Sequence, residues 1–172
     1  MRTPPSLPAP PGLVTCRALV AYDDAAREIL TALKNRGVRA HVGELAGPLA
    51  SLVPDVDGLV VTWAPTSDRR RRARGFDQAE LLARAVARRL GRPARRLLRR
   101  VPGPPQAGRS HDERIANPRF VTVRRNVAPV LLIDDVTTSG ATLSRAASAL
   151  RRAGAPAVHG LVVARAPRPG QH

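Results

Sequence analysis

Apolar runs along the chain predict strands that are buried on both faces of a sheet. The clearest runs are VLLI at residues 130–133, GLVVTW at residues 58–63 and AVHGLVVA at residues 157–164. Apolar residues recur at helical spacing in residues 76–90 and from Leu143 onward. Strands that alternate with helices predict an α/β fold with a central, mostly parallel sheet flanked by helices, and a ligand site outside the carboxyl ends of the strands.

Shorter patterns predict a further strand, a further helix and an antiparallel strand pair. Residues 16–22 have the pattern of a short strand, and Asp23 or Asp24 after them can cap a helix. Residues 95–101 and 120–123 are expected to pair with each other, because a single long segment joins them.

That joining segment, residues 102–118, has no periodicity. Loops of this length without secondary structure are often functional lids. We therefore expect a flexible lid on the antiparallel pair. Its candidate ligand-contacting residues are Gln106, Arg109, Arg114 and Asn117.

Composition divides the chain into one domain and two ends. A length of 172 residues suggests a single domain, which we assign to residues 13–165. Residues 1–12 hold five prolines and are predicted to be a disordered leader. Residues 166–172 are predicted to be a loose tail.

The segment VLLIDDVTTSGAT, residues 130–142, combines a strand, an acidic pair, a loop of small and hydroxyl residues, and the start of a helix. Such a loop directs backbone N–H groups and hydroxyls at one spot, where the helix dipole favours an anion such as phosphate. Asp134 and Asp135 can accept hydrogen bonds from a vicinal diol or help to hold hydrated Mg²⁺. A phosphate beside a diol describes a ribose 5-phosphate.

Five arginines in residues 69–75 form the most basic stretch of the chain. One interpretation is a solvated basic loop. The other is a pyrophosphate clamp, since arginine presents a fork of donors that matches phosphate oxygens. The sequence leaves both interpretations open.

Composition narrows the class of protein further. The formal net charge of +16 favours contact with phosphates or nucleic acid, without choosing between a nucleotide and DNA. A single cysteine, Cys16, excludes an internal disulfide and a cysteine-rich zinc site. No apolar run approaches the ~18 residues of a membrane span, and residues 1–12 lack the apolar stretch of a signal peptide, so we expect a cytoplasmic protein.

Other folds also place acidic residues or glycine loops at strand ends. A receiver domain needs a lysine after its acidic strand end, but the chain's lysine, Lys34, precedes this one. The glycine-lysine signature of a P-loop and the glycine pattern of a Rossmann loop do not occur. A purely structural strand-turn-helix with two solvated aspartates stays open as an alternative.

Residues 130–142 resemble, over their full length, the thirteen-residue phosphoribosyl pyrophosphate (PRPP) motif of type I phosphoribosyltransferases. The resemblance implies that fold, with Mg²⁺ as the expected cofactor, and it places the lid where those enzymes carry a flexible catalytic loop. It implies that Asp134 and Asp135 contact the ribose hydroxyls. The implied 5-phosphate loop consists of Val136, Thr137, Thr138, Ser139, Gly140, Ala141 and Thr142.

A narrower resemblance, over residues 18–165, is to the ComF group of phosphoribosyltransferases. It is carried by YDD at residues 22–24, Leu33-Lys34, the stretch APTSDRRRRARGFDQAELLA, the PRPP motif, and Gln106, Arg114, Asn117 and Phe120. It implies that Arg70, Arg74 and Gly75 lie on the pyrophosphate side.

The chain also departs from the ComF pattern. It has no cysteine-rich zinc module, and Asp24 and Asp77 stand where glycine and asparagine are usual. Thr138 occupies the place of an acidic residue that serves the base in purine-salvage members, so purine salvage is not expected.

Two functions from different classes follow. The first is a PRPP-binding phosphoribosyltransferase that releases pyrophosphate, for which the sequence identifies no general base and no acceptor. The second is a non-catalytic competence or DNA-processing factor that binds single-stranded DNA, with DNA-processing proteins as further partners. A PRPP-sensing transcriptional regulator is less favoured, because no helix-turn-helix pattern occurs. A homodimer is compatible with either function.

Overall fold

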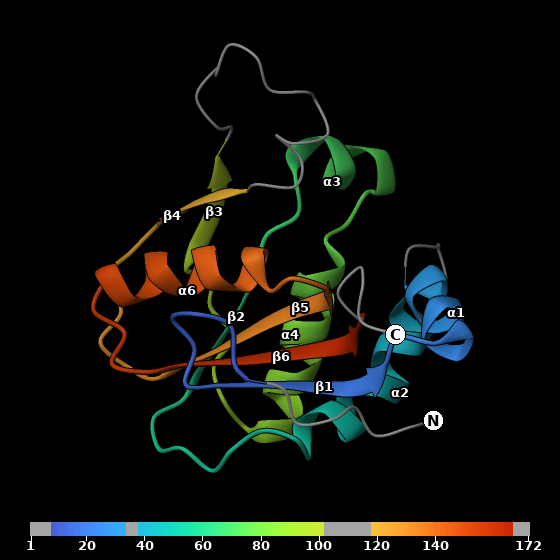
Figure 1. Cartoon of the computed structure of the whole chain (residues 1–172), viewed down its shortest axis with the longest axis horizontal. Coiled ribbons are helices and arrows are strands. Elements are labelled where there is room, and N and C mark those ends of the chain that lie inside the picture. Colours follow the sequence, from blue (N-terminus) through green and yellow to red (C-terminus); the bar gives the residue numbers. More distant parts are fainter. Residues whose placement is uncertain (1–7, 34–37, 102–117, 167–172) are drawn as a thin grey trace.

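Four parallel strands form the central sheet: β1 (Thr15–Ala21), β2 (Val60–Trp63), β5 (Val130–Thr137) and β6 (Val158–Arg165). They lie in the order β1-β6-β5-β2, which Figure 1 shows in cartoon form. The structure is a computed structural model that describes residues 8–33, 38–101 and 118–166. The predicted parallel sheet is confirmed.

Helices cover both faces of this sheet. α1 (Asp24–Ala32), α2 (Val38–Ala50) and α4 (Gln78–Leu90) lie on one face. α6 (Ala141–Arg152) lies on the other face, beside the antiparallel pair of β3 (Leu98–Val101) and β4 (Arg119–Thr122).

Alternate residues of each strand pack into one of two cores. Leu131 and Ile133 of β5 pack with Trp63 on the side of α1, α2 and α4. Val130 and Leu132 pack on the side of α6. Successive side chains of a strand point to opposite faces. A strand that packs on both faces therefore needs apolar residues throughout, which explains the unbroken run VLLI.

The arginine stretch differs from its prediction. Expected as a loop, it contains the short helix α3 (Asp68–Arg74). The Ser67 hydroxyl accepts a hydrogen bond from the Arg70 backbone N–H, and Gly75 ends the helix at φ 81°. The loop prediction was wrong because this helix is held by its caps and has no buried residue, so no apolar periodicity marks it.

Two other helices also differ from expectation. α4 begins at Gln78, whereas the apolar pattern predicted a helix from Phe76, because Asp77 adopts an extended conformation and caps the helix. α2 was not predicted at all. It contains Gly43, Gly47 and Pro48, which disfavour helix and weaken the apolar pattern.

Part of the predicted leader packs against the domain. Pro10 is buried, and the Leu13 backbone N–H donates to the Pro10 carbonyl at 3.1 Å. A Cβ atom added to Gly140 would lie 2.6 Å from Cγ of Pro10, so the two residues are in close contact. Residues 1–7 lie outside the described part of the chain, and disorder there stays a prediction.

The described helices include none with the length and apolar character needed to cross a bilayer. The expected cytoplasmic location stays a prediction, as does a homodimer.

We expect Leu132→Ala to destabilise the protein by about 2–5 kcal/mol, because it leaves a cavity in a well-packed core. Leu132 is completely buried between the sheet and α6. Urea unfolding with an unchanged m value measures the loss.

Val127→Ala is the control, because Val127 is 70% exposed. It should change the free energy of unfolding by less than about 0.5 kcal/mol. Equal effects of the two substitutions would contradict the assigned core.

Candidate functional site

A cleft of about 310 Å³ opens at the carboxyl ends of β2 and β5. It lies where a parallel α/β sheet is expected to bind a ligand. Segments that are far apart in the sequence meet there. The residues that line it are Ala64, Pro65, Thr66, Arg70, Arg74, Asp77, Gln78, Ala79, Arg100, Asp134, Asp135, Val136 and Thr142.

The acidic pair is held rigidly at the end of β5. β5 pairs with β6 up to Thr137, beyond both carboxylates. The Asp135 backbone N–H donates to Oδ1 of Asp134 at 2.9 Å, and the Val136 N–H donates to Oδ1 of Asp135 at 2.7 Å. The backbone therefore orients both carboxylates before any ligand arrives.

Asp134 lies in an environment that disfavours its charge. Burial raises its pKa well above the usual range, and the neighbouring charge of Asp135 raises it further. The N–H that Asp135 donates opposes this shift only in part. The neutral form of Asp134 is therefore favoured, and a cation or a hydroxyl donor in the cleft would favour the charged form.

Three arginines line the same cleft: Arg70 and Arg74 from α3, and Arg100 from β3. Burial lowers the pKa of Arg100, and the nearby charge of Arg70 lowers it further. The arginines therefore crowd one another, which favours an anion between them.

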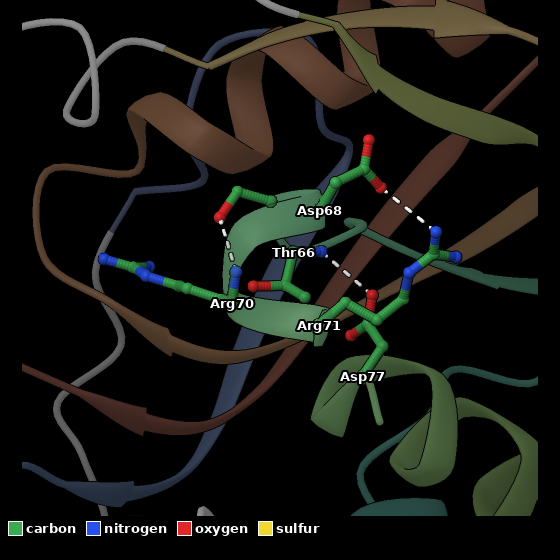
Figure 2. Close-up of polar contacts among 6 residues, drawn as sticks. Thr66, Asp68, Arg70, Arg71 and Asp77 are labelled. Atoms are coloured by element: carbon green, nitrogen blue, oxygen red, sulfur yellow. Dashed lines mark hydrogen bonds and ion pairs between the residues drawn. The ribbon is translucent and has the colours of Figure 1, made fainter. Parts of the chain in front are cut away.

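Figure 2 shows that successive arginines of α3 point to different places. Arg71 turns back and pairs with Asp68 at 3.1 Å on the exposed side of the helix. Arg70 extends away from that ion pair, and it lines the cleft. Of this basic stretch, only Arg70 and Arg74 therefore line the cleft.

Asp77 joins the arginine helix to α4. Its Oδ2 accepts from the Thr66 backbone N–H at 2.9 Å, as drawn in Figure 2, and its Oδ1 accepts from the Ala79 N–H at 3.1 Å. Burial raises the pKa of Asp77, although these N–H groups partly oppose the shift. The carboxylate thus links the segment before α3, at Thr66, to the first turn of α4, at Ala79, in the cleft wall.

Gln78 supports one of the arginines. Nη1 of Arg74 donates to its Oε1 at 2.7 Å. Its Nε2 is buried and has no hydrogen-bond partner within the described ranges.

The predicted 5-phosphate loop runs from the end of β5 into the first residues of α6. Thr137 is buried, whereas Thr138 and Ser139 are exposed. Gly140 has φ 77° and makes no side-chain cap hydrogen bond to α6, and the Ser139 hydroxyl lies 3.4 Å from the Ala141 nitrogen. The start of α6 is therefore weakly capped, which suits an anion.

The structure brings together six of the predicted site residues in the cleft: Asp134, Asp135, Val136, Thr142, Arg70 and Arg74. Gly75 and the loop residues Thr137, Thr138, Ser139, Gly140 and Ala141 are not among the lining residues. The predicted lid residues, Gln106, Arg109, Arg114 and Asn117, lie outside the described residues. The roles assigned to these residues stay predictions.

A larger hollow of about 530 Å³ lies between α2 and α4. Apolar residues and three arginines line it, and none of the predicted site residues does. We place the candidate site in the smaller cleft, because the charged residues converge there.

Comparison with curated proteins finds the competence protein ComFC of Bacillus subtilis (strain 168), which is 32% identical over 145 residues. The match covers 80% of this chain and 58% of ComFC, so the chain spans a little over half the length of that relative. The chain belongs to the ComF family. No family model matches the sequence.

In this ComF-family chain, Asp77 explains one departure from the family pattern. An asparagine offers one side-chain oxygen, whereas Asp77 accepts hydrogen bonds on both oxygens. The second carboxylate oxygen of Asp77 therefore accepts the hydrogen bond from the Thr66 backbone N–H. It also places a buried ionisable group near the cleft.

Arg100 and Gln78 are polar residues of the cleft that were not predicted as site residues. Arg100 was predicted only as part of the strand at residues 95–101, and the fold of the β3–β4 pair brings it to the cleft. Gln78 was treated as part of a helix. Its position three residues after Gly75, close to the arginine stretch, was the available signal.

We expect Asp134→Asn to raise the melting temperature at pH 7. The raised pKa means that the folded protein holds a proton which the unfolded chain releases. Stability is therefore lost as pH rises above about 3.9, the ordinary aspartate pKa. Asparagine removes this loss and keeps an oxygen for the Asp135 N–H.

Thermal unfolding from pH 3 to pH 8 measures the effect, which should vanish at the acidic end. Asp55→Asn is the matched control, since Asp55 is exposed. A lower melting temperature for Asp134→Asn at pH 7 would contradict the burial of an unfavourable charge.

Proposed function

We propose that this ComF-family chain has the type I phosphoribosyltransferase fold and binds PRPP in the cleft at the end of β5. The observation that carries the proposal is the meeting of the Asp134–Asp135 pair with three arginines in that cleft. A ribose offers hydroxyl donors to carboxylates, and phosphates offer acceptors to arginine. The cleft volume, about 310 Å³, also lies at the lower end of the range for small-molecule sites.

The proposed pose follows from the two sides of the cleft. Asp134 and Asp135 would accept hydrogen bonds from the ribose hydroxyls. The weakly capped start of α6 would receive the 5-phosphate, for which its N–H groups provide donors. Arg70, Arg74 and Arg100 would face the pyrophosphate.

The donor set fits Mg²⁺ that arrives with its ligand. Within the described residues, no three His, Cys, Asp or Glu side chains are grouped to hold a metal ion. Mg²⁺ usually combines one or two carboxylates with waters and substrate phosphates, and Asp134 and Asp135 can provide that share. When bound, the ion would neutralise charge on the pyrophosphate.

We further propose that the bound phosphoribosyl group is transferred to an acceptor. The bond from C1 of the ribose to the pyrophosphate oxygen breaks, and a bond from C1 to the acceptor forms. The arginines would stabilise the charge on the departing pyrophosphate, which grows during this step.

Asp134→Asn with Asp135→Asn should weaken PRPP binding by at least about a hundredfold, because two hydrogen bonds between charged groups and ligand are lost. Calorimetry with PRPP and Mg²⁺ measures this. The double variant Asp55→Asn, Asp57→Asn removes the same charge from two exposed positions and should bind as wild type.

Equal binding by wild type and the cleft variant, or no binding by either, would refute the PRPP site. Pyrophosphate release with a panel of acceptor bases then separates a transferase from a protein that only binds PRPP.

A second candidate function is single-stranded DNA binding. Four arginines, Arg71, Arg96, Arg99 and Arg100, line a small hollow beside the cleft, together with the acidic residues Asp68, Asp77 and Glu80. The relative ComFC is named a competence protein, which favours a role in DNA uptake. Trp63 also lines the hollow, but it is 2% exposed and offers no face for stacking on a base.

For this function, Arg96→Gln with Arg99→Gln should lower the slope of log K against log salt by about 1.4, about 0.7 for each phosphate contact. Titration of labelled single strands at several salt concentrations measures the slope. Arg124→Gln with Arg125→Gln is the control, because both arginines are exposed and Arg125 lies at the opposite end of the sheet, near Gly58 and Ala128. Equal slopes for the two variants would argue against this surface.

A further inference from the structure

Gln78 carries a buried group that the fold leaves without a partner. It is the first residue of α4 and is only 3% exposed. Its Nε2 has no hydrogen-bond partner among the described residues. A buried amide nitrogen of this kind is destabilising, and native proteins usually satisfy it with a water, an ion or a ligand.

The neighbouring arginine determines how the Gln78 amide is oriented. A guanidinium has donors and no acceptor, so the atom that faces Nη1 of Arg74 at 2.7 Å must be the oxygen. The nitrogen then occupies the other end of the amide. It needs an acceptor, which the arginines around it cannot supply.

Gln78 also lies in the part of the cleft where an anion is expected. It lines the cleft together with Arg70, Arg74 and Arg100. Gln78 and Arg74 flank the junction of α3 and α4, whereas the acidic pair and Thr142 belong to β5 and α6. A phosphate oxygen held by the arginines is an acceptor within this group.

We infer that the side-chain amide of Gln78 binds a pyrophosphate oxygen of the ligand, next to Arg74. This inference rests on the proposed PRPP site and adds a neutral donor to it. In the present conformation Nε2 has almost no exposed surface. The last torsion of a glutamine side chain is soft, so a small rotation turns the N–H toward the cleft while the oxygen stays near Arg74.

A neutral donor changes what the cleft selects. Arginines alone attract any anion, whereas the amide donates a directional hydrogen bond to one oxygen of the bound pyrophosphate. It also adds no further charge beside Arg70 and Arg100, which already crowd each other.

The test measures binding of inorganic pyrophosphate with Mg²⁺ and, separately, of ribose 5-phosphate. Gln78→Met keeps the approximate shape and removes both polar atoms. It should weaken pyrophosphate binding about tenfold or more, since a hydrogen bond to a charged ligand is lost, while the affinity for ribose 5-phosphate stays within about twofold.

Thermal unfolding gives an independent readout. Gln78→Met should melt at or above the wild-type temperature, because it removes a buried donor that has no partner. Gln78→Glu keeps an acceptor for Arg74 but replaces the donor with a charge, and it should also weaken pyrophosphate binding. Arg89→Met, on an exposed position of α4, should change neither affinity nor melting.

An Arg74→Met background separates direct binding from support of the arginine. If the amide binds the ligand itself, Gln78→Met still weakens pyrophosphate binding when Arg74 is absent. Loss of the effect in that background would overturn direct binding. Unchanged pyrophosphate affinity in Gln78→Met, or a clearly lower melting temperature without a change in affinity, would overturn it too.

The two proposals fail in different ways. A wild-type protein that binds neither pyrophosphate nor ribose 5-phosphate would refute the PRPP site and this inference with it. Binding of both ligands by wild type, with an unchanged pyrophosphate affinity in Gln78→Met, would refute only the role of Gln78.

Discussion

The position of β5 between β2 and β6 is the constraint on which the rest of the structure depends. Hydrogen bonds to both neighbours and apolar contacts on both faces hold this strand, and pairing with β6 continues to Thr137. The pairing with β6 therefore fixes the backbone positions of Asp134 and Asp135 at the cleft. The fold thus maintains a partly buried carboxyl, Asp134, whose raised pKa shows that its charge is disfavoured, as is common at ligand sites.

The opposite wall of the cleft is organised in a different way. α3 has no buried residue and is held by Ser67, Gly75 and the carboxylate of Asp77. Local hydrogen bonds of this kind open at a lower free energy than packed core does. The acidic wall is thus stiff and the basic wall adaptable, so arginines can adjust to a charged ligand that the strand end has already positioned.

The sequence predicted those features that depend on burial along one segment. The unbroken run VLLI marks β5, because its residues pack into the cores on both faces of the sheet. The helical spacing of Leu143, Ala146, Ala147 and Leu150 marks α6, because these residues pack into the core on one face. α2 was missed because glycine and proline interrupt its pattern, and α3 because capping alone holds it. Arg100 and Gln78 could not be assigned to a site, since their role arises only when β3 and α4 come together at the cleft.

The pairing of the first strand with the last has a consequence for how the protein is made. β1 hydrogen-bonds to β6, and Pro10 packs against Gly140, so the start of the chain completes both the sheet edge and the loop before α6. At about 5–20 residues per second, a ribosome needs on the order of ten seconds to make the residues between β1 and β6. β1 therefore cannot pair with β6 until β6 has been made, and contacts so distant in sequence slow folding.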